Sequence, residues 1–241
     1  MDVINTVPVE EVPVGTVTSG PLDDRRPEDE YLTIALTKGR LASQTMELLG
    51  RAGFYCEELG DKKSRKLVFT NEEQKLRFFL SKGPDVPTYV EYGAADIGVT
   101  GSDIIMEENR RVYEVLDLDF GKCRMCVAGP ESARELLRHH EMIRVASKYP
   151  NIAKDYFYNR KHQTIDIIKL NGSVELGPIV ELADVIVDIV ETGSTLKENG
   201  LGVLEEVCPI SARMIVNQVS MTMKAGRIRD FISRVRDAVN A

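Results

Sequence analysis

The chain has 241 residues, of which 43% are hydrophobic and 29% charged, and its formal net charge is −7. This length allows one large or two small α/β domains, and the composition is typical of a soluble protein. No apolar run is long enough to span a membrane and no signal sequence is visible, so we expect a cytoplasmic protein without membrane contacts.

The first 30 residues differ in composition from the rest of the chain. Eight carboxylates against two arginines give them a net charge of −6, which leaves −1 for residues 31–241. Four prolines and little apolar periodicity predict a disordered acidic extension that is too acidic for a typical organelle transit peptide. Because the body is almost neutral, we expect no nucleic-acid binding, and any phosphate specificity must come from a local arrangement.

Strand-like and helix-like segments alternate along the body. Its first half predicts a strand within 31–40 that ends in a glycine turn, a helix over 41–53, a hairpin of 65–70 and 76–81, a helix over 86–93 capped by Asp85, a buried strand over 95–101, and a helix over 103–110 capped by Ser102 or Asp103.

The second half continues this alternation. It predicts strands over 122–129, 142–147, 164–170 and 184–190, helices around 131–140, 151–161 and 174–181, a helical turn over 196–198, strand-like sequence over 204–220, and an amphipathic helix over 226–240. Such alternation predicts parallel sheets with binding loops at the carboxyl ends of the strands. The turns TKGR, VTGSD, NGSVE and ETGST all follow predicted strands, and we expect them to converge on one cleft.

The four cysteines give little support for a metal site. Only Cys123 and Cys126 are separated by a two-residue gap, and they lie in a predicted strand where positions three apart face opposite sides. The three histidines lie elsewhere in the sequence. We therefore expect structural or free thiols and no metal held by the protein alone.

Residues 188–195, DIVETGST, combine two carboxylates with a small hydroxyl-rich turn at the end of a buried strand. Carboxylates accept hydrogen bonds from ribose 2′ and 3′ hydroxyls, and backbone N–H groups of such a turn bind a terminal phosphate. The segment therefore fits a sugar phosphate. An isolated TGST is equally typical of a plain capped turn between a strand and a helix.

In its context, ADVIVDIVETGSTLKENGL, this stretch resembles the phosphoribosyl-pyrophosphate loop of the ATP phosphoribosyltransferase family, which opens histidine biosynthesis. The resemblance covers about residues 31–223, because five more segments match in order and spacing: TKGRL at 37–41, SRKL at 64–67, DVPTYVEYGAADIGVTGSD at 85–103, KYPNIAKDYF at 148–157 and NGSVEL at 171–176.

The resemblance implies an α/β chain of two lobes, similar to the periplasmic-binding-protein-like type II fold, with the active site in the cleft between them. Residues 31–121 and 205–241 would form the first lobe, and residues 122–204 the second, which carries the phosphoribosyl-pyrophosphate loop. The implied reaction is the Mg-dependent transfer of the phosphoribosyl group of phosphoribosyl pyrophosphate to N1 of ATP, with release of pyrophosphate.

The family's site residues carry over position by position. Those expected to bind phosphoribosyl pyrophosphate are Asp188 and Glu191 at the ribose hydroxyls and Thr192, Gly193, Ser194 and Thr195 at the 5′-phosphate. Arg40 and Arg65 match the cations that stabilise the departing pyrophosphate, a task that suits a planar and permanently charged guanidinium. Magnesium would travel with the substrate phosphates rather than sit in a protein cage.

Further residues are candidates for binding ATP or pyrophosphate: Lys38, Gly39, Lys82, Asp103, Lys148 and Glu175. The match around Lys82, in SKGPD, is looser than the others. From the residues alone, Asp103 is as easily a helix cap and Glu175 a solvated turn acid. On the same basis Arg40 and Arg65 are more easily exposed surface charges.

The matched region ends about 18 residues before the end of the chain, which leaves room for one helix and resembles the short form of the family. That form implies a regulatory subunit resembling histidyl-tRNA synthetase and a homodimer within a larger hetero-oligomer. The last helix would pack on its own lobe through Ile228, Phe231, Ile232, Val235 and Val239. The alternative function is a non-catalytic two-lobe module that binds or senses a small ligand; the paired acids, the phosphate turn and the arginines disfavour it.

Overall fold

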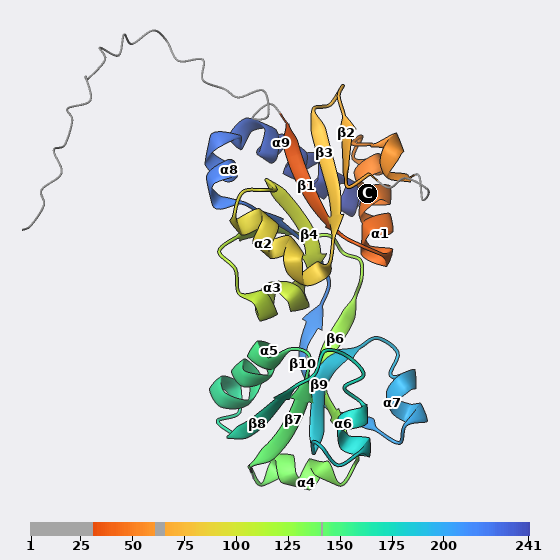
Figure 1. Cartoon of the computed structure of the whole chain (residues 1–241), viewed down its shortest axis with the longest axis vertical. Coiled ribbons are helices and arrows are strands. Elements are labelled where there is room, and N and C mark those ends of the chain that lie inside the picture. Colours follow the sequence, from red (N-terminus) through yellow and green to blue (C-terminus); the bar gives the residue numbers. More distant parts are fainter. Residues whose placement is uncertain (1–30, 61–65, 141) are drawn as a thin grey trace, which may run out of the picture. The chain divides into compact units, whose positions relative to one another are not determined.

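The computed structural model describes residues 31–60, 66–140 and 142–241, which form two β-sheets with helices packed on them (Figure 1). The predicted acidic extension, residues 1–30, and the candidate Arg65 lie outside these described residues. We call each sheet together with its helices a lobe; the first lobe contains the start of the described chain.

The sheet of the first lobe has, within the described residues, the strand order β2-β3-β1-β4-β11-β5. β1 pairs in parallel with β3 and β4, and the other neighbours are antiparallel. The strands are β1 (Leu32–Thr37), β2 (Val68–Asn71), β3 (Leu76–Ser81), β4 (Ile97–Gly101), β5 (Tyr113–Asp117) and β11 (Ala212–Val216). The helices are α1 (Arg40–Arg51), η2 (Glu57–Gly60), η3 (Gly83–Asp85), α2 (Val86–Glu91), α3 (Ser102–Glu108), α8 (Gln218–Met223) and α9 (Ala225–Asn240).

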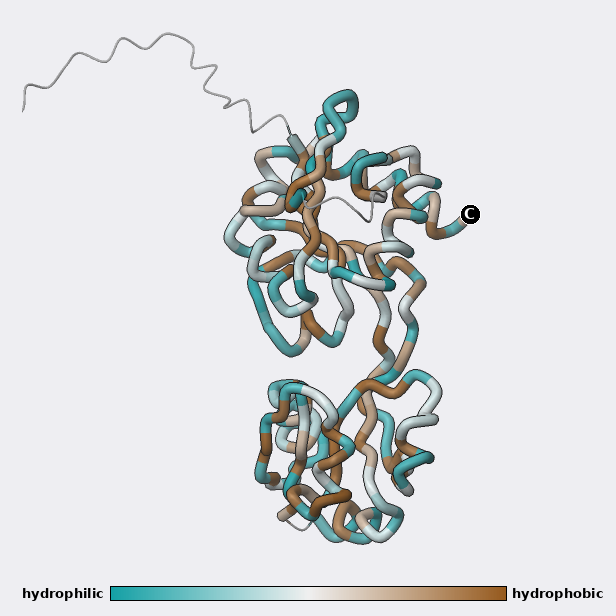
Figure 2. The backbone as a smooth tube through the Cα atoms, turned by 45° about the vertical axis from the view of Figure 1, so that its right-hand side comes forward, coloured by the Kyte–Doolittle hydropathy of each residue, from teal (hydrophilic) through white to brown (hydrophobic). Residues whose placement is uncertain are grey.

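The two faces of the first sheet have separate cores, because successive side chains of a strand point to opposite sides. Ile34 of β1 packs in one cluster with residues of α1 and α9, whereas Ala35 packs in another with Val86 and Val90 of α2. Figure 2 shows hydrophobic residues concentrated along the strands. The first lobe is therefore a sheet covered by helices on both sides.

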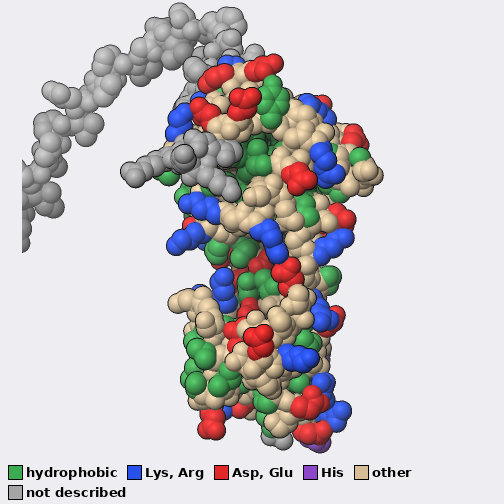
Figure 3. All heavy atoms as spheres, turned by 90° about the vertical axis from the view of Figure 1, so that its right-hand side faces the viewer, with side chains coloured by type: hydrophobic (Ala, Val, Ile, Leu, Met, Phe, Trp, Pro, Cys, Tyr) green, Lys and Arg blue, Asp and Glu red, His purple; other side chains and the backbone are tan. Residues whose placement is uncertain are grey.

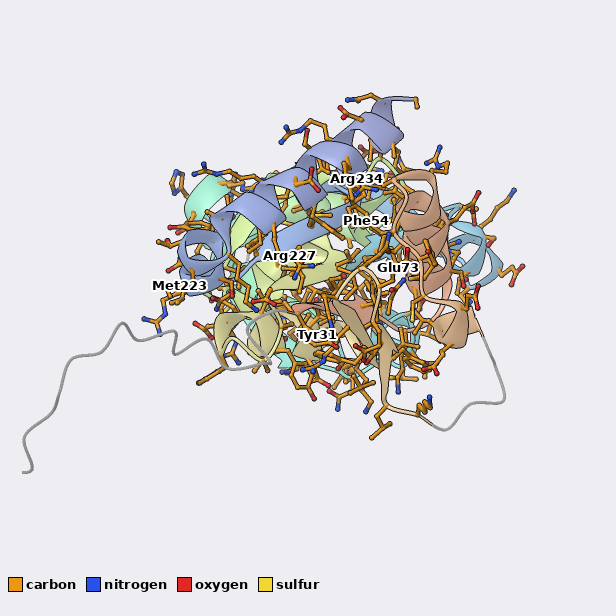
Figure 4. The ribbon with its side chains drawn as sticks, turned by 90° about the horizontal axis from the view of Figure 1, so that it is seen from above. Tyr31, Phe54, Glu73, Met223, Arg227 and Arg234 are labelled. Carbon is orange, nitrogen blue, oxygen red and sulfur yellow. The ribbon has the colours of Figure 1, made fainter. Side chains whose placement is uncertain are left out.

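The closing helix packs on the first lobe, as predicted. Ile228, Phe231, Ile232 and Val235 are buried in the cluster shared with α1, and Val239 packs against its edge. The Phe231 ring stacks on Phe54 with centroids 4.4 Å apart, and the Arg234 guanidinium lies 4.0 Å from the centre of the Phe54 ring (Figure 4).

The sheet of the second lobe has, over the described residues, the order β10-β6-β9-β7-β8. β7 pairs in parallel with β8 and β9, whereas β6 is antiparallel to β9 and β10. The strands are β6 (Cys123–Gly129), β7 (Ile143–Ser147), β8 (Ile165–Lys169), β9 (Val185–Val190) and β10 (Gly202–Ile210). The helices are α4 (Ala133–Arg138), α5 (Pro150–Lys154), the π-helix η4 (Asp155–Arg160), α6 (Leu176–Ile179) and α7 (Ser194–Glu198).

The thiols lie as the strand pattern of β6 predicts. Cys126 is buried in the core on one face of the second sheet, and Cys123 packs against the core on the other face. All four cysteines are free thiols. The hairpin of β2 and β3 is also confirmed, with Phe69 opposite Phe78 in its antiparallel register.

Several predicted elements are wrong. Both sheets are mixed rather than parallel, because strands such as β6 and β11 run against their neighbours. The expected strand over 204–220 divides into β10, β11 and the helix α8, which begins because the side chain of Asn217 accepts a hydrogen bond from the N–H of Ser220. The edge strand β5 has no predicted counterpart, since all its residues are exposed or half-buried. Neither Asp85 nor Ser102 caps a helix through its side chain.

The predicted lobe boundaries remain predictions. β10 spans the expected boundary between residues 204 and 205, and it pairs with β6 along its whole length. None of the described helices is long and apolar enough to cross a membrane. Figure 3 shows Lys, Arg, Asp and Glu side chains interspersed over the described part of one face, as expected of a nearly neutral body.

Candidate functional site

The loop between β9 and α7 forms a cavity of about 300 Å³. Its lining includes all six residues predicted to bind phosphoribosyl pyrophosphate and also Glu175. Gly193 adopts a left-handed conformation with φ 77°, which glycine reaches without steric cost, and turns the chain into α7. The buried side chain of Leu196 anchors the loop, while Thr192, Ser194 and Thr195 are exposed. The loop therefore presents its polar groups to a ligand.

Asp188, near the end of β9, is a carboxylate in an unfavourable environment. Burial raises its pKa, and the negative charges of Glu175 and Asp103 raise it further. A hydrogen bond from the backbone of Ile189 and the positive charge of Lys148 act in the opposite direction. Three of the candidate ATP or pyrophosphate residues, Glu175, Asp103 and Lys148, thus lie close enough to Asp188 to influence its ionisation.

Asp103 is buried within α3, although it belongs to the first lobe. Burial raises its pKa, whereas hydrogen bonds from the Tyr149 hydroxyl and from the backbone of Ile104 lower it. Its carboxylate folds back over Gly101: a Cβ atom on that glycine would lie 2.1 Å from Oδ1 of Asp103. Only glycine leaves room for this position of the carboxylate. The N-cap residue of α3 is Gly101 rather than the predicted Ser102 or Asp103.

Arg40 and Glu191 bring the two lobes together at a second point. The two guanidinium nitrogens donate to the two carboxylate oxygens at 3.1 and 3.2 Å. This hydrogen-bonded pair raises the pKa of Arg40. Both side chains are exposed, at 66% and 54%. A ligand can therefore reach and separate them without disturbing a core.

The remaining candidates, Lys38, Gly39 and Lys82, do not line the cavity of the β9–α7 loop. The N–H of Lys38 donates to the carbonyl of Ser81, and Lys82 precedes η3. Gly39 is the N-cap residue of α1 and lines a different cavity of about 570 Å³ in the first lobe. Among the described residues, no group of three or more His, Cys, Asp or Glu side chains is arranged to hold a metal ion.

Two residues near the site were missed or undervalued in the sequence. Cys123 lies near Asp103, Glu191 and Arg40, and burial together with the two carboxylates raises its pKa to about 11. Tyr149 is buried beside Asp103, and this proximity had no local signal, since the two residues are far apart in the chain. The matched segment KYPNIAKDYF contains Tyr149 but does not indicate its partner.

Comparison with known proteins decides the family. A family model described as HisG, ATP phosphoribosyltransferase, matches residues 82–237. The ATP phosphoribosyltransferase of Lachnoclostridium phytofermentans is 69% identical over 210 residues, which are 87% of this chain and 98% of that protein. That of Lachnospira eligens is 71% identical over 206 residues, 86% of this chain and 95% of that protein.

The chain belongs to the ATP phosphoribosyltransferase family. It is accordingly a phosphoribosyltransferase of the first step of histidine biosynthesis, and the non-catalytic alternative is not favoured. Enzymes of this family need a divalent metal.

Two solved structures support the predicted two-lobe type II fold. The ATP phosphoribosyl transferase (HisG:HisZ) complex from Thermotoga maritima matches with a TM-score of 0.73 and 34% identity, over 87% of this chain and 98% of that one. Tv2483 bound to L-arginine matches with a TM-score of 0.55 at 11% identity, over 86% of this chain and 84% of that one, which shows the fold alone. The recognition of the family and of its fold in the sequence is confirmed.

Proposed function

We propose that the cavity of the β9–α7 loop binds phosphoribosyl pyrophosphate. Asp188 and Glu191 accept hydrogen bonds from the ribose hydroxyls, and the turn Thr192 to Thr195 binds the 5′-phosphate. The observation that carries this assignment is that the two acids and the turn line one cavity.

Arg40 stabilises the departing pyrophosphate in this proposal. In the absence of substrate its guanidinium pairs with Glu191, and both groups are exposed. Ribose hydroxyls on Glu191 and pyrophosphate oxygens on Arg40 would replace this pair with two new charge-assisted contacts. Arg65 is assigned the same task from the matched SRKL segment, and it lies outside the described residues.

Asp103, Lys148 and Glu175 border the same region and are assigned to orient the substrates. Glu175 lines the phosphoribosyl cavity itself, so we assign it to orient phosphoribosyl pyrophosphate rather than ATP. The positive charge of Lys148 acts on both Asp103 and Asp188 and opposes the rise of their pKa values. Lys38 and Gly39 stay candidates for binding the ATP phosphates because they lie in the matched TKGRL turn. Lys82 stays a candidate on the looser match of SKGPD.

The reaction needs positioning and charge stabilisation more than proton transfer. The lone pair of adenine N1 forms a bond to C1 of the ribose, and the bond from C1 to the pyrophosphate oxygen breaks with its electron pair leaving on the pyrophosphate. Positive charge builds on the ribose ring and negative charge on the leaving group. Fixed cations and oriented donors stabilise both.

We assign Mg²⁺ as the divalent metal. It prefers oxygen ligands, keeps several waters and is commonly bound through substrate phosphates together with one or two carboxylates. Glu175 and Asp103, whose charges act on Asp188, are carboxylates that would supply such ligands beside the substrate phosphates. The metal supplies charge neutralisation at the polyphosphates when it is bound.

We also propose that the enzyme works in the cytoplasm with a regulatory subunit like HisZ. The Thermotoga maritima protein with which this chain shares 34% identity was solved as a HisG:HisZ complex. A homodimer within such an assembly is the expected form, with ATP and phosphoribosyl pyrophosphate as small-molecule partners.

A coupled assay tests the proposal. The purified chain is mixed with ATP, phosphoribosyl pyrophosphate, Mg²⁺ and a pyrophosphatase, and the N1-substituted adenine is followed by its absorbance. We expect product that disappears when the metal is chelated and returns when Mg²⁺ is added. Absence of product at high enzyme concentration, with and without the regulatory partner, would contradict the proposed function.

A further inference from the structure

Helix α3 belongs to the first lobe by chain order but packs into the second. It follows β4 directly, and the N–H of Ser102 donates to the carbonyl of Ser211 at 2.9 Å. Its Ile104, however, is part of the buried core cluster that contains Met125 of β6 and Ile152 of α5. Helices α3 and α5 contact each other (Figure 1). An apolar side chain of one lobe thus completes the core of the other.

Glu107, one helical turn after Asp103, caps α5 from outside. Its carboxylate accepts hydrogen bonds from the N–H groups of Asn151 and Ile152 at 3.0 and 3.1 Å, and its carbonyl accepts from Nδ2 of Asn151 at 2.8 Å. The N-cap residue of α5, Tyr149, supplies no side-chain cap, and Pro150 has no N–H. Glu107 therefore provides the capping that the sequence of α5 lacks.

Tyr149 connects the same helix to β9. Its hydroxyl lies beside the carboxylate of Asp103 and acts to lower the pKa of that carboxyl, and its N–H donates to Oγ of Ser147 at 2.8 Å. The Ser147 hydroxyl in turn donates to the carbonyl of Val187 at 2.6 Å, one residue before Asp188. Tyr149 thus faces Asp103 with its side chain and is joined through its backbone N–H and Ser147 to the strand that carries the phosphoribosyl loop.

We infer that Tyr149 and Glu107 are positioning residues, which hold α3 against α5 and so fix Asp103 relative to the phosphoribosyl loop at Asp188. The inference rests on the proposed function, because it assigns these residues to the alignment of the two substrates. Asp103 and Glu107 lie four residues apart and so face the same side of α3. Helix α3 is thereby held at two points, one at Asp103 in its first turn and one at Glu107, which contacts the start of α5.

This arrangement predicts a specific kinetic effect. No residue of α3 lines the β9–α7 cavity, so loosening α3 leaves the lining of the phosphoribosyl pyrophosphate site intact. The turnover step depends on both substrates being aligned, and small misplacements of reacting groups cost large factors in rate. A positioning role therefore lowers kcat without weakening the binding of phosphoribosyl pyrophosphate.

Tyr149→Phe is the main test, because it removes the hydroxyl and keeps the buried ring. We expect kcat to fall by about tenfold while the Kd of phosphoribosyl pyrophosphate stays within about twofold. Tyr158→Phe is the matched control: its hydroxyl donates to the carbonyl of Ile165 at 2.8 Å, within the same lobe but away from α3. That variant should leave both quantities unchanged. A wild-type kcat in Tyr149→Phe, or an equal loss in the control, would overturn the inference.

A double-mutant cycle separates positioning from a general structural effect. If Tyr149 acts through Asp103, adding Tyr149→Phe to Asp103→Asn changes kcat no further. Glu107→Gln, which keeps one acceptor oxygen, should retain more activity than Glu107→Ala. Fully additive losses in the cycle would contradict the inference. Failure of the proposed function looks different, because the wild-type chain would then form no product at all.

Discussion

Two aspartates near the opposite ends of β9 have contrasting environments. Asp184, just before the strand, accepts hydrogen bonds from the N–H, Nε and Nη2 of Arg144 at 2.7, 3.3 and 2.8 Å, and this guanidinium lowers its pKa. Asp188, inside the strand, has its pKa raised by burial and by Glu175 and Asp103. Four residues apart, one carboxylate is fully paired and the other is held in surroundings that disfavour its charge.

The contrast separates a structural end of the strand from a ligand-binding end. Arg144 lies on β7, so its bonds to Asp184 join two neighbouring strands where their parallel pairing begins. Among the described residues, no guanidinium pairs with Asp188, which lines the cavity at the other end of the strand. Carboxylates in unfavourable surroundings within a cavity are typical of functional sites, where the ligand supplies the missing partner.

The largest effect is expected from Asp188→Asn. Replacing the carboxylate removes charge-assisted hydrogen bonds to the ribose hydroxyls, so the Kd of phosphoribosyl pyrophosphate should rise roughly ten- to a hundredfold. The free energy of unfolding should not fall, since the substitution removes a charge that its surroundings disfavour. Calorimetric titration and denaturant unfolding measure the two quantities. A loss of stability with unchanged affinity would mean that the roles of the two aspartates are reversed.

Asp184→Asn should have the opposite result. Loss of the charged acceptor leaves Arg144 incompletely paired, and we expect the free energy of unfolding to fall by about 1.5 kcal/mol. The kcat and the Kd of phosphoribosyl pyrophosphate should not change. Asp166→Asn is the control, because Asp166 is an exposed acid whose charge also acts on Arg144. Equal destabilisation by both variants would indicate long-range charge rather than the hydrogen bonds.

The sequence revealed one of these ends and not the other. Asp188 and Glu191 stand beside the phosphate turn in the chain, so a local motif was enough to place them together. Asp184 and Arg144 are 40 residues apart, and Arg40 and Glu191 are 151 apart. Nothing local marks such pairs, because they arise only when strands and lobes come together.

The fold shows the same difference between features that a local sequence pattern marks and features that depend on distant contacts. Strands with buried, apolar patterns such as β4 and β9 were predictable, since every residue or most residues of each strand are buried. The polar edge strand β5 was not, and neither was the antiparallel direction of β6 and β11, which local alternation does not encode. The capping of α5 by Glu107 likewise depends on a contact between lobes.

Acidification should change the two aspartate variants in opposite directions. The folded pKa of Asp184 is lowered from 3.8, so its stabilisation is present above that value and is lost as the pH falls through the folded pKa. The stability difference between wild type and Asp184→Asn should therefore shrink below pH 4. The folded pKa of Asp188 is raised, so its charge destabilises the fold as the pH rises through that pKa. Asp188→Asn should gain relative stability as the pH rises, as measured by denaturant unfolding across pH 3–7.

The smallest effect is expected in the turn that leads into β9. Glu181 has φ 59°, a left-handed conformation that disfavours side chains, and its carbonyl accepts a hydrogen bond from Nη1 of Arg144 at 2.9 Å. Glu181→Gly relieves that conformation but gives the unfolded chain more freedom, so we expect a net gain of about 0.5 kcal/mol in unfolding free energy.

Glu181→Ala is the control for this change. It removes the same carboxylate, whose charge acts favourably on Arg144, and keeps a Cβ in the left-handed position. It should therefore fail to stabilise the protein, and both variants should keep the wild-type kcat. If alanine stabilises as much as glycine, the charge of Glu181 rather than its backbone is the unfavourable feature. In that case Arg144 would be sufficiently neutralised by Asp184 alone, and the paired end of β9 would depend on a single carboxylate.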